Sequence, residues 1–334
     1  MKTILVTGGA GFIGSNFVHL VRRERPDWKI VVLDKLTYSG RKENLADVLC
    51  DGQVEFVKGD ICNEKAVAKA MQHCEIVFNF AAETHVDRSL QDGGSFVQTN
   101  VYGVYTLLEA ARANGVERFV QVSTDEVYGE VNEGFSVETD ALTPRSPYSA
   151  AKAGGELIAQ SYYVSHGVPV IITRGSNTFG THQFPEKLIP LFITNALDDK
   201  PLPLYGDGLQ QRDWIFAEDH ASAILKAAED GQPGEIYNVG GGNQQTNRAI
   251  TSHILQLLDK PDSLIETVAD RPGHDRRYAL DCSKIKGLGW EPQSDFQDAL
   301  RQTVDWYLAN QTWWRVIKES KSFAEYYQKN YTRK

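Results

Sequence analysis

The chain has few sulfur-containing residues and no long apolar run. Its 334 residues include only 4 cysteines and 2 methionines. The cysteines lack C-x-x-C spacing, which argues against a metal site or a disulfide framework and predicts reduced structural thiols. No apolar stretch approaches the ~18 residues of a membrane span, and the short apolar run before Thr7 cannot form a secretory signal core. We therefore expect a soluble, cytoplasmic protein with no membrane partner.

An excess of basic residues is also missing. Lys and Arg total 35 against 44 Asp and Glu, which gives a formal net charge of −9. This balance argues against a nucleic-acid partner, because such proteins need a basic face. Hydrophobic residues make up 41 % of the chain, enough for a sizeable core. The length predicts about two domain-sized units or one large α/β unit.

Short β-branched runs alternate with helical stretches through the first half of the chain. The expected strands are residues 4–7, 30–34, 54–58, 76–81, 119–123 and 170–174. The clearest expected helices are residues 12–24, 95–114 and 147–166. The strand runs are continuously apolar, which is typical of parallel strands covered on both faces. The pattern predicts an α/β fold with a Rossmann-type doubly wound parallel sheet.

A glycine-rich segment follows the first expected strand and opens the first expected helix. Residues 7–14 read T-G-G-A-G-F-I-G. Glycines in this context allow a tight turn beside a pyrophosphate, which the helix N-terminus also attracts. Asp34 lies 20 positions after Gly14 and ends the second strand, where a carboxylate accepts ribose hydroxyls and repels a 2′-phosphate. We therefore expect NAD rather than NADP, with Asp60 near the adenine; Lys35 could partly offset that repulsion.

Tyr148 and Lys152 lie one helical turn apart. Ser146 is a candidate N-cap and Pro147 suits the first helical position, so Tyr148 and Lys152 share one helix face. A phenol with a pKa of ~10 is a weak base at neutral pH. A neighbouring ammonium group and a positively charged nicotinamide would stabilise the phenolate. The spacing therefore indicates that Tyr148 acts as a base toward a sugar or alcohol hydroxyl.

These two motifs together resemble the extended short-chain dehydrogenase/reductase family, which acts mostly on nucleotide sugars. A third motif, S-T-D-E-V-Y-G at residues 123–129, resembles the corresponding segment of the dTDP-glucose 4,6-dehydratases. Sugar 4-epimerases of the same superfamily usually lack the acid pair in this motif. Further matching segments are residues 81–89, 183–190, 205–208, 212–214 and 270–276. The resemblance extends from about residue 2 to residue 315.

The resemblance implies dehydration of dTDP-glucose to the 4-keto-6-deoxy sugar nucleotide. In this scheme Tyr148 deprotonates the hydroxyl on carbon 4, Thr124 holds the same oxygen, and NAD receives a hydride that later returns to carbon 6. Glu126 then removes the proton from carbon 5 and Asp125 protonates the hydroxyl leaving carbon 6. Adjacent carboxyl groups can divide these tasks when their environments separate their pKa values. With Lys152, these residues form the expected catalytic set.

The same resemblance implies the binding residues. Those expected to bind NAD are Gly8, Gly11, Phe12, Ile13, Gly14, Asp34, Lys35, Leu36, Thr37, Asp60, Ile61, Ala81, Ala82, Thr99, Tyr148, Lys152 and Thr178. Those expected to bind the sugar nucleotide are Thr84, His85, Thr124, Asn177, Glu186, Lys187, Leu188, Pro203, Leu204, Tyr205, Arg212, Asn247, Arg271 and His274. Lys187, Arg212 and Arg271 should form a local basic pocket for the diphosphate.

The resemblance also implies an organisation for the whole chain. Residues 1–175 should mainly hold NAD, residues 176–315 should mainly form a smaller nucleotide-sugar lobe with chain crossings, and residues 316–334 should form a tail. Residues 311–334 are expected to be a helix packed on the body. A homodimer through helices 95–114 and 147–166 is expected.

One loop departs from the family pattern. Residues 176–183 read S-N-T-F-G-T-H-Q, where the family commonly has S-N-N-Y-G-P-Y-Q. Asn177 is retained, whereas Phe179 lacks a hydroxyl and Thr181 replaces a rigid proline. Three alternatives to the dTDP-glucose reaction stay open: dehydration of UDP-glucose, 4-epimerisation, and a catalytically silent NAD-binding sensor or scaffold.

Overall fold

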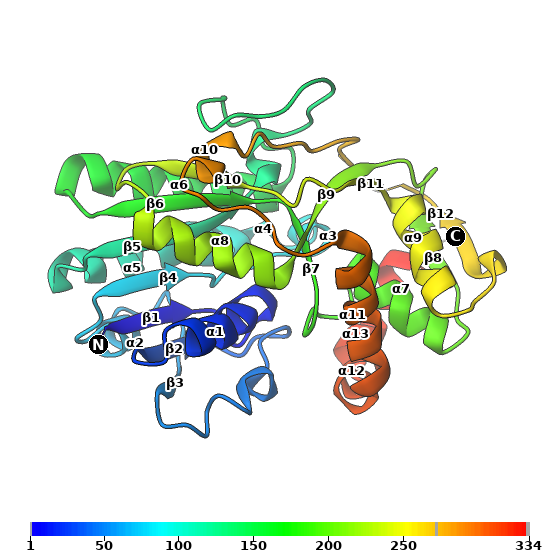
Figure 1. The fold of residues 1–334 in the computed structure, drawn as a ribbon, viewed down its shortest axis with the longest axis horizontal. Helices are drawn as coiled ribbons and strands as arrows, with labels where there is room; N and C mark the ends of the chain where they lie inside the picture. The colour runs from blue at the N-terminus through cyan, green and yellow to red at the C-terminus, as the bar shows by residue number, and fades with distance from the viewer. Residues whose placement is uncertain (1, 271–272, 332–334) are drawn as a thin grey trace.

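A computed structural model of the protein describes residues 2–270 and 273–331. Its strands are β1 (Thr3–Thr7), β2 (Lys29–Asp34), β3 (Val54–Lys58), β4 (Ile76–Asn79), β5 (Arg118–Thr124), β6 (Val170–Gly175), β7 (Asn177–Phe179), β8 (Leu202–Tyr205), β9 (Gln211–Phe216), β10 (Ile236–Val239), β11 (Gln244–Thr246) and β12 (Ile265–Val268). Seven of them form a parallel sheet in the order β10-β6-β5-β4-β1-β2-β3 (Figure 1). The predicted doubly wound parallel sheet is therefore confirmed.

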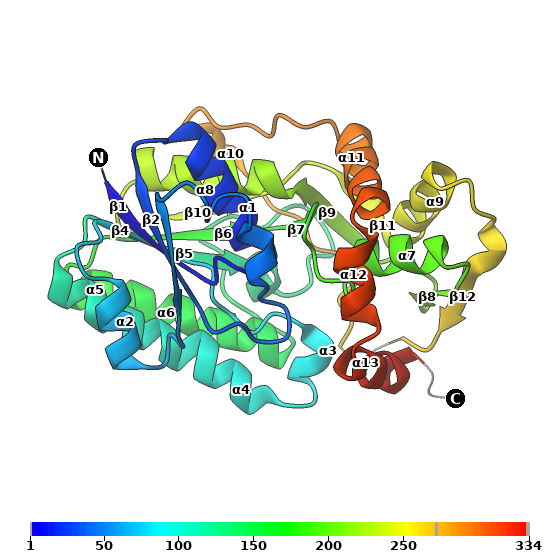
Figure 2. The same ribbon diagram turned by 90° about the horizontal axis from the view of Figure 1, so that it is seen from below.

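Helices cover both faces of this sheet. The α-helices are α1 (Phe12–Glu24), α2 (Glu64–Ala70), α3 (Val86–Ser89), α4 (Gly93–Val97), α5 (Gly103–Asn114), α6 (Pro147–His166), α7 (Leu188–Leu197), α8 (Ala217–Asp230), α9 (Asn247–Leu257), α10 (Ser283–Lys286), α11 (Phe296–Ala309), α12 (Gln311–Lys318) and α13 (Lys321–Tyr331). Short 3₁₀ turns are η1 (Lys42–Leu45), η3 (Asp125–Tyr128) and η4 (Asp262–Leu264), and η2 (Gln98–Tyr102) is a π-helix. Helices α1 and α8 lie on one face, and α2, α5 and α6 lie on the other (Figure 2).

Strand β1 shows why the predicted strands are continuously apolar. Ile4 and Val6 are fully buried in the core cluster that includes residues of α1 and α8. Leu5 is fully buried in the cluster on the opposite face, with residues of α2, α5 and α6. Because successive side chains point to opposite faces of a strand, a sheet covered on both sides needs apolar residues at every position.

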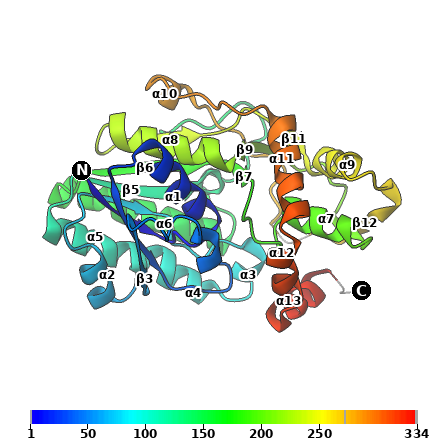
Figure 3. The same cartoon turned by 60° about the horizontal axis from the view of Figure 1, so that its bottom comes forward.

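The smaller lobe has its own sheets and its own core. Strands β7, β9 and β11 form one sheet and β8 pairs with β12. Helices α7, α9 and α11 pack with this lobe, and α11–α13 run along its junction with the large sheet (Figure 3). The chain crosses back between β9 and β11, since α8 covers the large sheet and β10 forms its edge. Among the described residues, no helix is both long and apolar enough to span a membrane.

Three elements of the structure differ from the predicted ones in their bounds or regularity. The strand expected over 76–81 ends at Asn79, because the next residues leave the sheet to line a cavity. The helix expected over 95–114 consists of α4, η2 and α5, so it contains a π-turn. The single tail helix expected over 311–334 is two helices, α12 and α13. They break at Ser320, whose hydroxyl accepts the Phe323 amide N–H (3.3 Å).

Candidate active site

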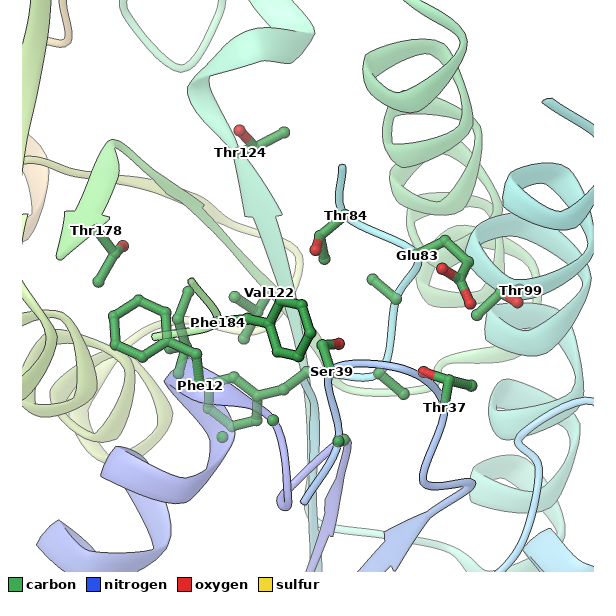
Figure 4. Close-up of a pocket in the computed structure, with 18 of the residues that line it drawn as sticks. Phe12, Thr37, Ser39, Glu83, Thr84, Thr99, Val122, Thr124, Thr178 and Phe184 are labelled. Carbon is green, nitrogen blue, oxygen red and sulfur yellow. The ribbon is translucent and has the colours of Figure 1, made fainter. Parts of the chain in front are cut away.

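A single cavity lies where the parallel strands end, between the large sheet and the smaller lobe. Strands β2 and β4 flank β1 on opposite sides, so the chain reverses its direction of winding there, which is the usual ligand position in such sheets. All five predicted catalytic residues line this cavity, and so do all the predicted NAD residues except Leu36. Figure 4 shows Thr124 and Thr178 toward one end of the cavity and Thr37, Glu83 and Thr99 toward the other.

The glycine turn brings backbone close to the cavity. Gly8 adopts a φ of +68°, a region that favours glycine, and a Cβ atom there would lie 2.6 Å from the backbone nitrogen of Ala81. The turn leads directly into α1, whose first-turn N–H groups lack intrahelical acceptors. This arrangement is suited to a pyrophosphate.

Asp34 stands at the end of β2, where its carboxylate orders the turns around it. One oxygen accepts the Ala10 amide (3.0 Å) and the other accepts the Leu36 amide (2.8 Å). Leu36 itself has a φ of +55°, so this bond holds a rare backbone conformation, and the NAD-binding role expected of Leu36 stays a prediction. Lys35 pairs with Asp60 at 2.7 Å, so its ammonium group is directed at that carboxylate rather than at Asp34.

Helix α6 delivers Tyr148 and Lys152 to the cavity. The Ser146 hydroxyl accepts the Ser149 amide, the Ser149 hydroxyl accepts the Ser146 amide, and Pro147 occupies the first turn, as the sequence predicts. Burial and the nearby Glu126 charge raise the pKa of Tyr148 well above its ordinary value. Burial lowers the pKa of Lys152 to about 8, and its ammonium donates to the Val122 carbonyl (2.6 Å). A phenolate at Tyr148 therefore needs added positive charge beside it.

The acid pair follows β5 on the short turn η3. The Thr124 hydroxyl accepts the Glu126 amide (3.3 Å) and donates to Asp125 Oδ1 (3.2 Å). Asp125 is only 3 % exposed, and burial next to Glu126 raises its pKa to about 8. Its Oδ2 atom has no hydrogen-bond partner among the described residues. This shift favours the protonated form of Asp125, and Glu126 lies beside it with partial exposure.

The residues of the cavity fit a dinucleotide with a nicotinamide ring. Within the described part of the chain, several buried polar atoms of its lining have no hydrogen-bond partner: Ser123 Oγ, Asp125 Oδ2, Asn177 Oδ1, Gln183 Oε1 and His220 Nε2. Buried polar atoms are rarely left unpaired in native proteins, so such a set indicates a polar ligand. The glycine turn and Asp34 line the same cavity, where the sequence predicts the pyrophosphate and the ribose.

The predicted sugar-nucleotide residues fall into two groups. Thr84, Thr124, Asn177, Glu186 and Lys187 line the cavity. The residues that do not line it are His85, Leu188, Pro203, Leu204, Tyr205, Arg212, Asn247 and His274, and Arg271 lies outside the described residues. The binding roles of both groups stay predictions.

Contacts within the protein hold most of the second group. Leu204 is 1 % exposed in the core of the smaller lobe. Arg212 donates to the Gln211 carbonyl (2.7 Å) and to the Asp275 carbonyl (2.8 Å), and its guanidinium lies 4.4 Å from the centre of the Tyr278 ring. His274 Nδ1 lies 2.6 Å from an Asp270 oxygen.

Sequence reasoning missed several residues of the lining. They include Tyr38, Ser39, Glu83, Phe184 and His220. The first two continue the loop that follows Asp34, and Glu83 lies inside a segment already matched to the family, so position in these motifs was an available signal. His220 lies on the buried face of α8, an amphipathic helix, and nothing in its sequence surroundings marks it.

This combination of features is typical of the extended short-chain dehydrogenase/reductase class of nucleotide-sugar enzymes. It comprises the parallel sheet, the glycine turn, and a Tyr–Lys pair in the same cavity as a buried acid. The chain belongs to the GDP-mannose 4,6 dehydratase family, whose sequence profile matches residues 5–303.

Known nucleotide-sugar enzymes are similar to this chain in sequence and structure over nearly its whole length. The dTDP-glucose 4,6-dehydratase of Streptomyces antibioticus is 49 % identical over 322 residues, covering 95 % of each chain. A crystal structure of the Streptomyces venezuelae dTDP-glucose 4,6-dehydratase with NAD bound has a TM-score of 0.93 and 48 % identity, covering 95 % of this chain and all of that one. The UDP-glucose 4-epimerase of Thermus thermophilus is more distant, with a TM-score of 0.86 and 32 % identity over 92 % of this chain and all of that one.

Proposed function

We propose that the chain converts dTDP-glucose to dTDP-4-keto-6-deoxyglucose and water, with NAD as a cofactor recycled in each turnover. The observation that carries this proposal is the buried Asp125 carboxyl, which lies beside Glu126 in the cavity that also holds Tyr148 and Lys152. A 4-epimerase needs no acid to expel a hydroxyl group, whereas a dehydratase does. The relatives of about 48 % identity named for this reaction support the choice.

Oxidation at carbon 4 depends on Tyr148, Thr124 and Lys152. Tyr148 takes the proton of the carbon 4 hydroxyl, and the Thr124 hydroxyl holds the same oxygen. Bound NAD supplies a hydride acceptor for carbon 4 and, once reduced, a hydride donor for carbon 6. The Lys152 ammonium and the cationic ring oppose the rise in the pKa of Tyr148 that burial and the Glu126 charge cause.

Elimination of water depends on the acid pair. The new ketone acidifies the proton on carbon 5, and Glu126 removes it. Asp125 donates its proton to the hydroxyl leaving carbon 6, which departs as water. Glu126 then returns a proton to carbon 5 as carbon 6 is reduced. The proton gained by Tyr148 and the one lost by Asp125 balance by exchange with solvent, so the net change is loss of one water.

Two single variants separate these roles. We expect Asp125→Asn and Glu126→Gln each to slow product formation by about 10²–10⁴-fold, the usual contribution of a positioned acid or base. In D₂O, Asp125→Asn should still exchange the carbon 5 proton of the sugar, whereas Glu126→Gln should not. Glu133→Gln, which changes an exposed acid of the following loop, is the matched control. Undiminished dehydration by an Asp125→Asn, Glu126→Gln double variant would rule the assignment out.

The preference for one sugar nucleotide over another is tested separately. kcat/KM for dTDP-glucose, UDP-glucose and GDP-mannose, measured on the pure protein, should be highest for dTDP-glucose. Turnover of UDP-galactose to UDP-glucose without a keto product would instead establish an epimerase. Absence of any product from all four would favour a silent NAD-binding module.

A homodimer is part of the proposal, formed through the face of α5 and α6. Large apolar side chains are exposed on these two helices and on α4 and η2, which precede α5: Val97 (56 %), Tyr102 (40 %), Tyr105 (38 %), Leu157 (56 %), Tyr163 (39 %) and Val164 (81 %). Several large exposed apolar side chains on neighbouring helices favour an interaction site there. Sedimentation equilibrium should give a dimer, and Leu157→Asp with Val164→Asp should give a monomer.

A further inference from the structure

His220 is a buried histidine of the cavity to which the proposed reaction gives no task. It lies in the first turn of α8, is 1 % exposed, and lines the cavity beside Gly175 and Thr178. Glycine is required at position 175, because a Cβ atom there would lie 2.4 Å from Cε1 and 2.5 Å from Nε2 of the imidazole ring. The backbone at the end of β6 therefore packs directly on this ring.

Thr178 contacts the Nδ1 side of this histidine. His220 Nδ1 lies 2.8 Å from the Thr178 hydroxyl oxygen, and that hydroxyl also lies 3.2 Å from the Ser176 carbonyl, to which it can donate. A hydroxyl group has one proton, so we assign that proton to Ser176 and the Nδ1 proton to the histidine as donor. Burial lowers the pKa of His220 to about 4, so the ring is neutral at pH 7. Nε2 is then unprotonated and acts as an acceptor.

Nε2 lacks a hydrogen-bond partner within the described part of the chain and is buried. The residue at position 178, which the sequence analysis assigned to NAD binding, lies on the same wall. A neutral acceptor atom suits an uncharged N–H donor. A neutral imidazole ring also does not repel a cationic ring of a ligand. The carboxamide of nicotinamide carries such an N–H₂ donor next to a cationic ring.

We infer that His220 accepts a hydrogen bond at Nε2 from the carboxamide N–H₂ of the bound nicotinamide and thereby fixes which way the carboxamide faces. His220 is thus a positioning residue for the cofactor. The inference rests on NAD being the cofactor in the proposed function, but not on the sugar nucleotide or the dehydration step.

The test compares ligands that differ at this one group. Displacement of labelled NAD from the holoenzyme is measured with three competitors: NAD, its 3-acetylpyridine analogue, which keeps the carbonyl but lacks N–H₂, and ADP-ribose, which lacks the ring. The parent protein should bind NAD about tenfold more tightly than the acetyl analogue, the factor expected for one buried hydrogen bond. His220→Leu should bring this ratio close to one, with ADP-ribose unaffected, and His220→Gln should restore part of it.

His253→Leu is the matched control. His253 also has a buried ring nitrogen without a partner among the described residues, but it packs near Phe296 in the smaller lobe, with ring centres 6.4 Å apart. Its substitution should leave all three competitors unchanged. The inference is overturned if His220→Leu retains the preference for NAD, or if it weakens NAD and ADP-ribose equally. Loss of the preference in a protein that dehydrates no sugar would support this inference while refuting the proposed reaction.

Discussion

Asp125 and Glu126 are neighbours in the chain, yet the fold gives them different surroundings. Asp125 turns into the protein, and burial with the adjacent Glu126 charge raises its pKa to about 8. Glu126 remains partly exposed at the cavity. The motif S-T-D-E-V-Y-G predicts that two carboxyl groups are present. Only the burial of one of them explains why Asp125 can hold a proton at neutral pH.

The raised pKa of Asp125 has a cost in stability. Between about pH 4 and pH 8 this carboxyl is ionised in the unfolded chain and protonated in the folded one, so the unfolded chain binds fewer protons and the stability falls as the pH rises. Asp125→Asn removes the ionisation. We expect the variant to be more stable than the parent by about 1–3 kcal/mol at pH 7.5, and equally stable near pH 4. Unfolding by urea at the two pH values measures this, and an equal difference at both would contradict it.

The same shift limits activity at high pH. Asp125 must be protonated to donate to the leaving hydroxyl, and Lys152, with its pKa lowered to about 8, must be protonated to stabilise the Tyr148 phenolate. We therefore expect kcat to fall above about pH 8, with a limiting slope steeper than one proton. A rate profile at saturating substrate tests this, and a rate that stays flat from pH 7 to about pH 10 would refute it.

At the scale of elements, the stretch from α4 to α5 shows what helical periodicity misses. Sequence reasoning predicts one regular helix over 95–114, but residues 98–102 form a π-turn. The wider turn directs Asn100 inward, where its amide accepts the Glu83 N–H (2.9 Å) and donates to the Glu83 carbonyl (2.9 Å). Thr99 in the same turn lines the cavity. Apolar spacing cannot reveal such a turn, since its partner is backbone 17 residues away.

Asn100→Ala tests this turn. It leaves both backbone groups of Glu83 without their buried partner, so we expect the protein to lose about 1–3 kcal/mol of stability and to bind NAD about tenfold more weakly. Asn114→Ala, at the exposed end of α5, is the control and should change neither. Unchanged NAD affinity in Asn100→Ala would show that the turn does not support the site.

At the scale of the whole molecule, the tail helix α13 packs against residues that adjoin those lining the cavity. The Tyr326 hydroxyl lies 3.1 Å from His85 Nε2, and the Arg88 guanidinium lies 3.9 Å from the Tyr38 ring centre and 4.9 Å from that of Tyr326. Arg88 also pairs with buried Glu186 at 2.9 Å. Four segments distant in sequence are thereby joined, and they include the loop after Asp34 and the loop before α7.

Tyr326→Phe tests whether this junction matters for the substrate. Loss of the hydroxyl releases one constraint on His85, so we expect KM for the sugar nucleotide to rise about fivefold while NAD affinity stays unchanged, since one neutral hydrogen bond contributes about 1 kcal/mol. Tyr327→Phe is the control, because its hydroxyl contacts Asn195 (3.2 Å) in the smaller lobe. A smaller rise for Tyr326→Phe than for Tyr327→Phe would contradict the expectation.

The sequence by itself determined the sheet, the glycine turn and which residues are expected to be catalytic, because each depends on local chemistry. Apolar runs report burial, glycines report tight turns, and helical spacing alone places Tyr148 and Lys152 on one face of α6. Only the tertiary structure decided the burial that raises the pKa of Asp125, the contact of His220 with Thr178, the partner of Lys35 and the contact of the tail with Arg88. Each of these features depends on groups that are far apart in the chain. Burial then changes the pKa values and hydrogen bonds of those groups, which the spacing of residues in the sequence does not predict.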